Sequence, residues 1–176
     1  MPETSQPAPR AGSDLAGAWA LDPRRTTIQF QTKALWIRTV EGTLRAVDGN
    51  GTVDGDGLAS GRVVFDATSI DTSNKRRDEH LRHADFFDAE HYPTVLFEVA
   101  GSRITTRGLS TITGDLSIRG VSRPVRLQAA VQPRADGAVT VSAETEIDRS
   151  AWGMTWTRMG AGIHNRVTIE ATFIRS

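Results

Sequence analysis

Regular alternation of apolar and polar residues limits what this chain can fold into. From Val125 to Val131, for example, every second residue is apolar, and Arg126 and Gln128 stand between them. Successive side chains of a β-strand point to opposite faces, so a period of two predicts strands with one buried face. About eight stretches share this pattern, with no helical period between them. They are 26–31, 36–48, 61–69, 94–101, 112–118, 125–131, 139–147 and 166–173.

The connections between these stretches are mostly short and polar, which favours an antiparallel sheet with one face in water. Asp48–Gly51 is a strong turn signal, and 55–57 is a second one. Eight such strands can form a sandwich or close into a barrel. Closure removes exposed edges, and no internal proline marks an edge strand. We therefore predict an all-β fold, an eight-stranded antiparallel barrel.

The inward positions of this barrel mix large and small residues. The small ones are Gly42, Ala46, Gly114, Ala129, Ala143 and Ala171. Side chains either fill an eight-stranded barrel or leave room for one small ligand, and the small residues favour a cavity. Alternatively, they fit the taper or the bulges of a filled barrel. Strands of about ten residues, tilted by about 40°, would enclose a tunnel roughly 25 Å tall, long enough for a chain molecule.

One segment, residues 69–93, breaks the alternation. Ser73 or Asn74 can cap a short helix, and Pro93 returns the chain to the sheet. We therefore predict a short helical insertion between strands near residues 74–91.

This insertion carries an apolar wedge made of Leu81, Phe86 and Phe87. Asp85 can cap the turn that leads into the two phenylalanines. An apolar wedge needs a partner surface, and in a single-domain barrel that surface is the open end. We therefore expect the insertion to cover one end of the barrel.

Composition argues against several function classes. Lysine plus arginine equals aspartate plus glutamate at 21 each, so the formal net charge is zero and nucleic acid is not expected as the main partner. The absence of cysteine excludes disulfides, thiol catalysis and thiolate metal sites.

Residues 1–16 are rich in Pro, Ser, Ala and Gly and predict a disordered tail before a single domain over 17–176. The N-terminus has no apolar core of a secretory signal, and no window approaches the roughly 20 apolar residues of a membrane helix. We therefore expect a cytoplasmic protein without stable membrane insertion, unless a leader was removed.

Histidines and carboxylates in the insertion raise the question of a metal site. His80 and His83 can share a helix face, with Asp85 close by. The intervening Leu81 and Arg82 do not give the His-Glu-x-x-His arrangement of metalloproteases. We expect no metal here and expect His80 to hold the loop by hydrogen bonding. No Gly-x-Ser-x-Gly elbow occurs either, and we predict that the protein is not an enzyme.

Ordered motifs run from Trp19 to the C-terminus. They are Trp19-x-Leu21-Asp22-Pro23, Thr27-x-x-Phe30 with Lys33, Ile70-Asp71-Thr72-x-Asn74, Arg77-Asp78-x-His80-Leu81-Arg82, Asp85-Phe86-Phe87-Asp88, Tyr92-Pro93, the run from Gly114 to Val125, and Ile147-x-Arg149 with Trp152-Gly153-Met154. In these motifs the chain resembles the YceI-like, polyisoprenoid-binding family of lipocalin-like barrels. It departs at His83 and Trp152, where the family more often has serine and phenylalanine.

The resemblance implies a lipocalin-like barrel whose tunnel holds one long lipid, such as an isoprenoid quinone, a polyprenyl phosphate or a fatty-acid derivative. It also implies a homodimer, no catalytic chemistry and no cofactor other than the lipid. The alternative is a filled barrel that serves as a structural or stress-response interaction module.

Strand parity and the apolar wedge predict the ligand-binding residues, except for Trp152, which is either a ligand-facing wall or a core residue and whose direction the sequence does not indicate. With Trp152 they are Ile28, Phe30, Trp36, Val40, Leu44, Leu81, Phe86, Phe87, Phe97, Leu116, Trp152 and Ile169. Arginine suits bidentate contacts to anions, so Arg77, Arg82, Arg149 and Arg158 are candidates for holding a headgroup. The connection around Met154 and Trp156 is rich in glycine, and we expect it to be mobile and able to gate the entrance.

Overall fold

A computed structural model of the protein describes residues 13–35 and 37–176. Within these residues the chain forms nine strands, one α-helix and four short 3-10 helices. The strands are β1 (Gly17–Leu21), β2 (Thr27–Ala34), β3 (Arg38–Val53), β4 (Leu58–Asp71), β5 (Thr94–Arg103), β6 (Leu109–Ile118), β7 (Val121–Pro133), β8 (Val139–Asp148) and β9 (Ala161–Arg175). The helices are η1 (Ser13–Leu15), η2 (Pro23–Arg25), α1 (Lys75–Arg82), η3 (Arg149–Trp152) and η4 (Arg158–Gly160).

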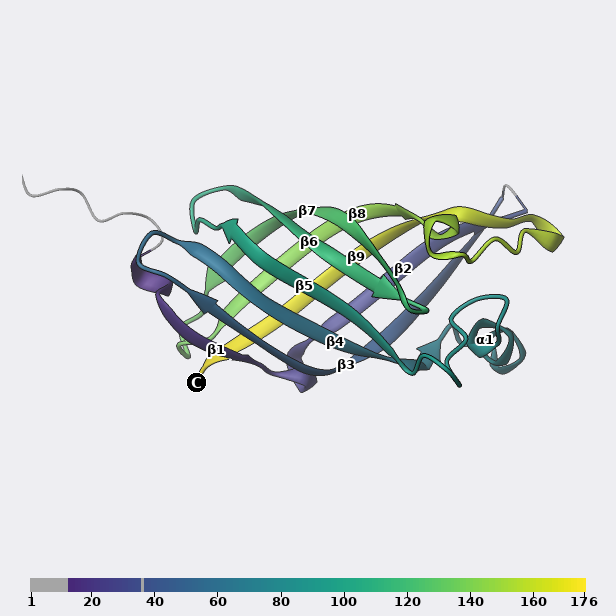
Figure 1. Ribbon diagram of the computed structural model, residues 1–176, viewed down its shortest axis with the longest axis horizontal. Helices are drawn as coiled ribbons and strands as arrows, with labels where there is room; N and C mark the ends of the chain where they lie inside the picture. The colour runs from purple at the N-terminus through teal and green to yellow at the C-terminus, as the bar shows by residue number, and fades with distance from the viewer. Residues whose placement is uncertain (1–12, 36) are drawn as a thin grey trace, which may run out of the picture.

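The strands form one closed antiparallel barrel (Figure 1). From β2 to β9 each strand pairs with the next, and β9 pairs back with β2. Strand β1 pairs with β3 and β9, the same two neighbours as β2. The nine strands therefore fill eight positions of the barrel, because η2 interrupts one of them. The predicted eight-stranded antiparallel barrel is confirmed.

The alternating apolar and polar residues of the sequence lie on the inner and outer faces of this barrel, respectively. Along β7, Val125, Leu127, Ala129 and Val131 are buried, whereas Arg126 and Gln128 are exposed. An extra residue at Val47 breaks the period on β3, because Ala46 pairs with Phe65 whereas Asp48 pairs with Val64. Such a bulge turns two successive side chains outward. This accounts for the exposure of Val47, at 48%.

The prediction of a turn at residues 48–51 is wrong. Strand β3 continues through these residues because it pairs with β1 on one side and with β4 on the other. The strands approach closely here, since a Cβ at Gly61 would lie 2.3 Å from the Asn50 carbonyl oxygen. The turn comes later, where Asp54 Oδ1 accepts the Leu58 backbone N–H and Gly57 has a φ of 80°. A Cβ at Gly49 would also lie 2.9 Å from Cβ of Leu21, so Gly49 and Gly61 serve close packing rather than reversal of the chain.

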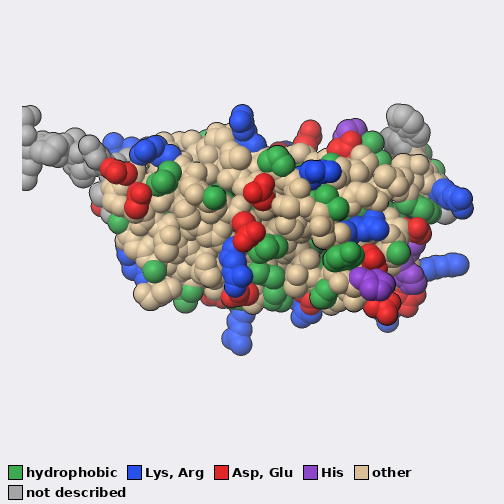
Figure 2. Space-filling view, in the orientation of Figure 1, with side chains coloured by type: hydrophobic (Ala, Val, Ile, Leu, Met, Phe, Trp, Pro, Cys, Tyr) green, Lys and Arg blue, Asp and Glu red, His purple; other side chains and the backbone are tan. Residues whose placement is uncertain are grey.

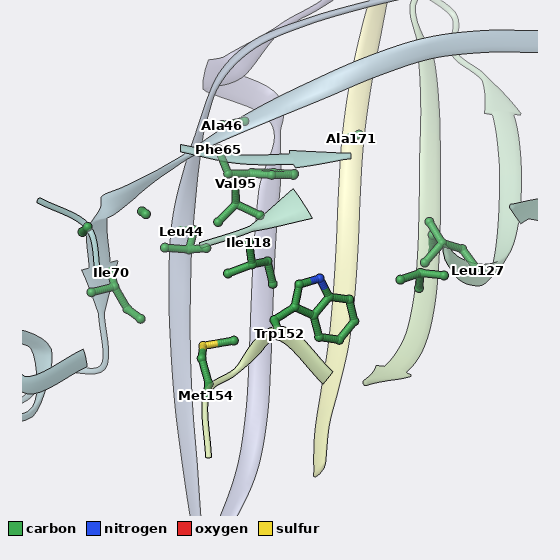
Figure 3. Packing of buried hydrophobic residues seen from close by; sticks show 14 of the residues in the cluster. Leu44, Ala46, Phe65, Ile70, Val95, Ile118, Leu127, Trp152, Met154 and Ala171 are labelled. Carbon is green, nitrogen blue, oxygen red and sulfur yellow. The ribbon is translucent and has the colours of Figure 1, made fainter. Parts of the chain in front are cut away.

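The apolar core forms two clusters along the barrel. In the larger one, Trp152 and Met154 from the β8–β9 connection pack among strand residues such as Leu44 and Ile118 (Figure 3). The smaller cluster lies at the other end and includes Leu15.

Residues 13–16, expected within the disordered tail, are folded. Leu15 is only 3% exposed, and its carbonyl accepts the Trp19 indole N–H at 2.9 Å. Residues 1–12 lie outside the described part of the chain.

Candidate ligand-binding cavity

The interior of the described barrel contains two hollows with no lining residue in common. The large cavity, of about 840 Å³, lies at the end that α1 covers. The small cavity, of about 160 Å³, lies at the end where Leu15 and Trp19 pack. Sites for small molecules usually measure about 300–1,000 Å³, which makes the large cavity the candidate site. The single tunnel expected from strand length is therefore divided in two.

Aromatic rings cover two of the inward glycines. A Cβ at Gly42 would lie 2.2 Å from Cζ of Phe30, and a Cβ at Gly114 would lie 2.6 Å from Cζ of Phe97. These glycines make room for a neighbouring ring and not for a ligand. Ala46 and Ala129, at 6% and 0% exposure, line neither cavity, whereas Ala143 and Ala171 line the small one. None of the six small inward residues lines the large cavity, and the alternative interpretation is correct for the two glycines and for Ala46 and Ala129.

The large cavity has an apolar interior and a polar rim. Its apolar lining comes from Ile28, Phe30, Val40, Leu44, Leu81, Phe86, Phe87, Val95, Leu116, Ile118, Ile147, Met154, Trp156 and Val167. Its polar lining comes from Thr32, Asn74, Arg76, Arg77, Glu79, His80, His83, Arg149 and Asn165. Three segments meet around it, namely the β2–β3 hairpin, α1 with the turn that follows, and the β8–β9 connection (Figure 1).

Helix α1 is attached to the end of β4 by its own polar side chains. Asn74 Oδ1 accepts the Arg77 backbone N–H at 3.1 Å and caps the helix, as predicted. Asp78 is buried and accepts both the backbone N–H and the hydroxyl of Thr72, at 2.9 and 2.5 Å. Arg82 Nε donates to the Thr68 carbonyl at 2.9 Å. These contacts fix the helix over the mouth of the barrel.

His80 joins this helix to the segments beside it. Its Nε2 lies 3.0 Å from Oδ2 of Asp85, and its ring centroid lies 5.2 Å from that of Phe86 and 4.7 Å from that of Trp156. The prediction that His80 holds the loop is confirmed. The carboxylate of Asp85, expected to cap a helical turn, pairs with His80. Within residues 13–35 and 37–176, no three His, Cys, Asp or Glu side chains gather as metal ligands would.

Arg149 shapes the β8–β9 connection from inside. Its Nε donates to the Gly162 carbonyl at 2.9 Å, and its Nη2 donates to the carbonyls of Trp156 and Ala161 at 2.6 and 3.4 Å. Its Nη1 donates to the Met154 carbonyl. One buried side chain thus satisfies four backbone acceptors of an irregular segment. The glycine content predicts a mobile connection. In the structure, the hydrogen bonds from Arg149 hold this connection along its length.

Arg149 is 6% exposed, and its guanidinium carbon lies 5.1 Å from the ring centroid of Phe86. Burial lowers the pKa of Arg149 from its ordinary value, and the adjacent Asp148 carboxylate opposes this effect. An arginine nevertheless stays charged in a protein. The wall of the large cavity therefore carries a positive charge that is held mainly by carbonyl dipoles.

A family model for the YceI-like domain matches residues 19–174, which is most of the chain. The chain belongs to the YceI-like domain family. Protein YceI of Escherichia coli is 33% identical to it over 130 residues, covering 72% of this chain and 68% of that protein.

Solved structures with the same fold extend the likeness. Burkholderia cenocepacia BcnA superposes with a TM-score of 0.75 at 19% identity, covering 86% of this chain and 98% of that one. A polyisoprenoid binding domain from Saccharophagus degradans superposes with a TM-score of 0.70 at 15% identity, covering 90% and 98%. At these identities the likeness shows the fold.

Most of the predicted ligand-binding residues line the large cavity of this YceI-like chain. These are Ile28, Phe30, Val40, Leu44, Leu81, Phe86, Phe87 and Leu116. Phe97 and Ile169 line the small cavity. Trp152 lines neither, and its indole N–H donates to the Leu116 carbonyl at 2.8 Å. Trp36 lies outside the described residues.

The four headgroup candidates lie in different places. Arg149 lines the large cavity, with donors on backbone carbonyls. Arg82 lines neither cavity and bonds to β4, and Arg158 is exposed on η4. Arg77 on α1 lines the rim of the large cavity, and so does Arg76, which the sequence analysis did not single out. The helical position of Arg76 beside the wedge is the signal that could have identified it.

Asp148 gives the β8–β9 connection a pH dependence. It accepts the backbone N–H and the hydroxyl of Ser150 at 2.9 and 2.5 Å, and these hydrogen bonds lower its pKa below its ordinary value. A lowered carboxyl pKa stabilises the fold above the unfolded pKa of about 3.9, and that contribution is lost as the pH falls through the folded value. We expect Asp148→Ala to lower the free energy of unfolding by about 1 kcal/mol at neutral pH. Urea titrations should show this difference shrinking below about pH 4. A difference that grows in acid would contradict the assignment.

Within the described residues, no helix is both long and apolar enough to cross a bilayer.

Proposed function

We propose that this protein binds one long apolar lipid in the large cavity and carries or stores it without catalysing a reaction. The observation that supports this most strongly is the cavity itself, about 840 Å³ in volume and lined mainly by apolar side chains beneath α1. Aliphatic and aromatic walls offer an apolar chain the environment it lacks in water.

Apolar burial supplies the driving force for such binding. A lipid chain that loses about 400 Å² of apolar surface gains about 10 kcal/mol at roughly 25 cal/mol per Å². Part of this gain offsets the lost freedom of the ligand. Because each buried methylene contributes about 0.8 kcal/mol, affinity should rise with chain length until the cavity is full.

The polar rim suits a headgroup at the mouth. Asn74, Arg76 and Arg77 line the cavity from α1, and an arginine fork fits a carboxylate or a phosphate. Arg77 Nε already donates to the Thr72 hydroxyl at 2.8 Å, whereas no hydrogen bond or ion pair of the described residues engages the exposed Arg76 side chain. We therefore propose Arg76 as the first contact of an anionic or carbonyl-bearing head.

Isoprenoid lipids are the first candidates for the ligand. The polyisoprenoid binding domain of Saccharophagus degradans shares the fold, which supports testing this class first. An isoprenoid quinone, a polyprenyl phosphate and a fatty-acid derivative all combine a long apolar chain with a head that the rim can meet.

Native mass spectrometry of the protein, purified without detergent, tests the proposal. We expect a complex with one lipid per chain, and solvent extraction followed by mass analysis of the extract identifies its class. Incubation with isoprenoids of increasing length should give increasing occupancy. A chain that carries no lipid and takes none up would contradict the proposal and favour the interaction module. The homodimer and the cytoplasmic location stay predictions, which sedimentation velocity and cell fractionation can check.

A further inference from the structure

The tip of the β2–β3 hairpin exposes large apolar side chains beside the mouth of the large cavity. Leu35 is 52% exposed and Ile37 is 90% exposed, and we call these two residues the apolar tip. Leu35 has a φ of 52°, in the left-handed region that a bulky residue rarely adopts. Its backbone N–H donates to the Gly160 carbonyl at 3.0 Å.

Basic residues surround the apolar tip. Lys33 and Arg38 flank it on the hairpin, and the bond from Leu35 to Gly160 brings the neighbouring Arg158 of η4 to the same end. No acidic residue occurs from position 23 to 40 or from 149 to 169. Within the described part of the chain no carboxylate forms an ion pair with these three side chains. Basic side chains project from this end in Figure 2, although the chain as a whole has zero formal charge.

The same segments form part of the cavity wall. Thr32, Ala34 and Val40 of the hairpin line the large cavity, as do Ala161 and Gly162 beside η4. A surface that receives the apolar tip would therefore lie at the entrance of the cavity. Acidic residues at this end include Glu41 on β3, whose carboxylate accepts the Gln31 side-chain N–H at 2.8 Å, and Glu79, Asp85 and Asp88 on the α1 side of the mouth.

We propose that the apolar tip docks on an anionic lipid bilayer, so that the cavity opens where lipid is available. Peripheral membrane binding needs burial of apolar side chains in the bilayer and electrostatic attraction to anionic lipids, and apolar side chains flanked by lysine and arginine provide both. A second copy of the chain fits less well, because a stable interface buries about 800 Å² per partner and two side chains offer far less. The transfer of lipid through this contact rests on the proposed function, whereas docking itself does not.

Vesicle co-sedimentation of the full chain tests the proposal. We expect binding to phosphatidylcholine vesicles that contain phosphatidylglycerol, weaker binding without it, and weakening by salt. Leu35→Asn with Ile37→Ser should weaken partitioning roughly 30-fold, since the apolar contribution is lost. Asparagine tolerates a positive φ, so this variant should fold. Lys33→Gln with Arg38→Gln should weaken partitioning onto anionic vesicles roughly 25-fold at low salt, because each lost cation weakens it about fivefold.

Matched controls lie at the opposite end of the barrel. Leu109→Ser removes an apolar side chain that is 68% exposed, and Arg107→Gln with Arg134→Gln removes two exposed cations; neither variant should alter binding. Equal binding by tip and control variants, or no wild-type binding to anionic vesicles, would overturn the proposal. So would a tip variant that changes only the oligomeric state in sedimentation velocity. Docking by a protein that takes up no lipid would refute the proposed function and leave this inference standing.

Discussion

The double substitution Ile28→Trp and Leu116→Trp should abolish lipid uptake while the barrel stays folded. Ile28 on β2 and Leu116 on β6 both line the large cavity, and their strands lie four positions apart in an eight-position barrel. Two indoles from opposite walls would therefore meet across the space that the lipid needs. We expect occupancy in native mass spectrometry to fall at least tenfold. Overpacking should lower the free energy of unfolding by about 1–3 kcal/mol.

Gln29→Trp with Asp115→Trp is the matched control for this experiment. It places the same two side chains on the same two strands, at exposed positions on the outer face. This control should bind lipid as the wild type does. Full occupancy in the cavity variant would mean that the lipid lies elsewhere.

Arg149→Met should cause the largest loss of stability among single substitutions in the β8–β9 connection. It removes the donor shared by four backbone carbonyls, of which the Gly162 carbonyl also accepts the Thr32 hydroxyl at 3.3 Å. Each buried acceptor that loses its donor typically costs about 1–3 kcal/mol, so we expect a loss of about 3–5 kcal/mol in the free energy of unfolding. In a domain of this size that corresponds to a melting temperature lower by about 10 °C. Calorimetry measures this shift, and hydrogen exchange should show lost protection over residues 153–162.

Two other variants separate the role of the guanidinium from that of its charge. Arg149→Lys keeps the charge but offers a single ammonium, so we expect it to recover only part of the lost stability. Arg158→Met removes an exposed arginine of the same connection and should change the free energy of unfolding by less than about 0.5 kcal/mol. An Arg149→Met protein as stable as Arg158→Met would show that the connection does not depend on this side chain.

The sequence predicts the strands and their buried residues, because an alternation of apolar and polar residues indicates directly which side chains face the interior. Residues such as Ile28, Leu44 and Leu116 are alternating apolar positions, and each faces the interior. The same rule extends to Ile118 and Ile147, which line the large cavity although they were not selected as site residues. The helix cap at Asn74 was also predictable, because capping is a local interaction.

Features that depend on distant partners were not predictable in this way. Residues 48–51 have the composition of a turn, but pairing with strands on both sides keeps them extended. Gly42 and Gly114 suggested space, but the rings of Phe30 and Phe97 occupy it. Local propensity gives way to tertiary packing in each case.

The site is less predictable than the fold for a related reason. The sequence around Met154 and Trp156 has no period, so nothing in it indicates that both line the cavity. Arg149 was selected for an anion, but its donors reach carbonyls that come together only in the folded connection.

Photo-crosslinking with a long isoprenoid that carries a diazirine on its tail can locate the bound chain. We propose that this chain lies in the large cavity, beneath α1. After illumination and digestion, we expect modified peptides from β2, from β6 and from residues 81–87, which supply Ile28, Leu116 and Phe86 to its wall. Adducts confined to the outer face of the barrel, on a protein that binds the probe with one-to-one stoichiometry, would contradict this proposal.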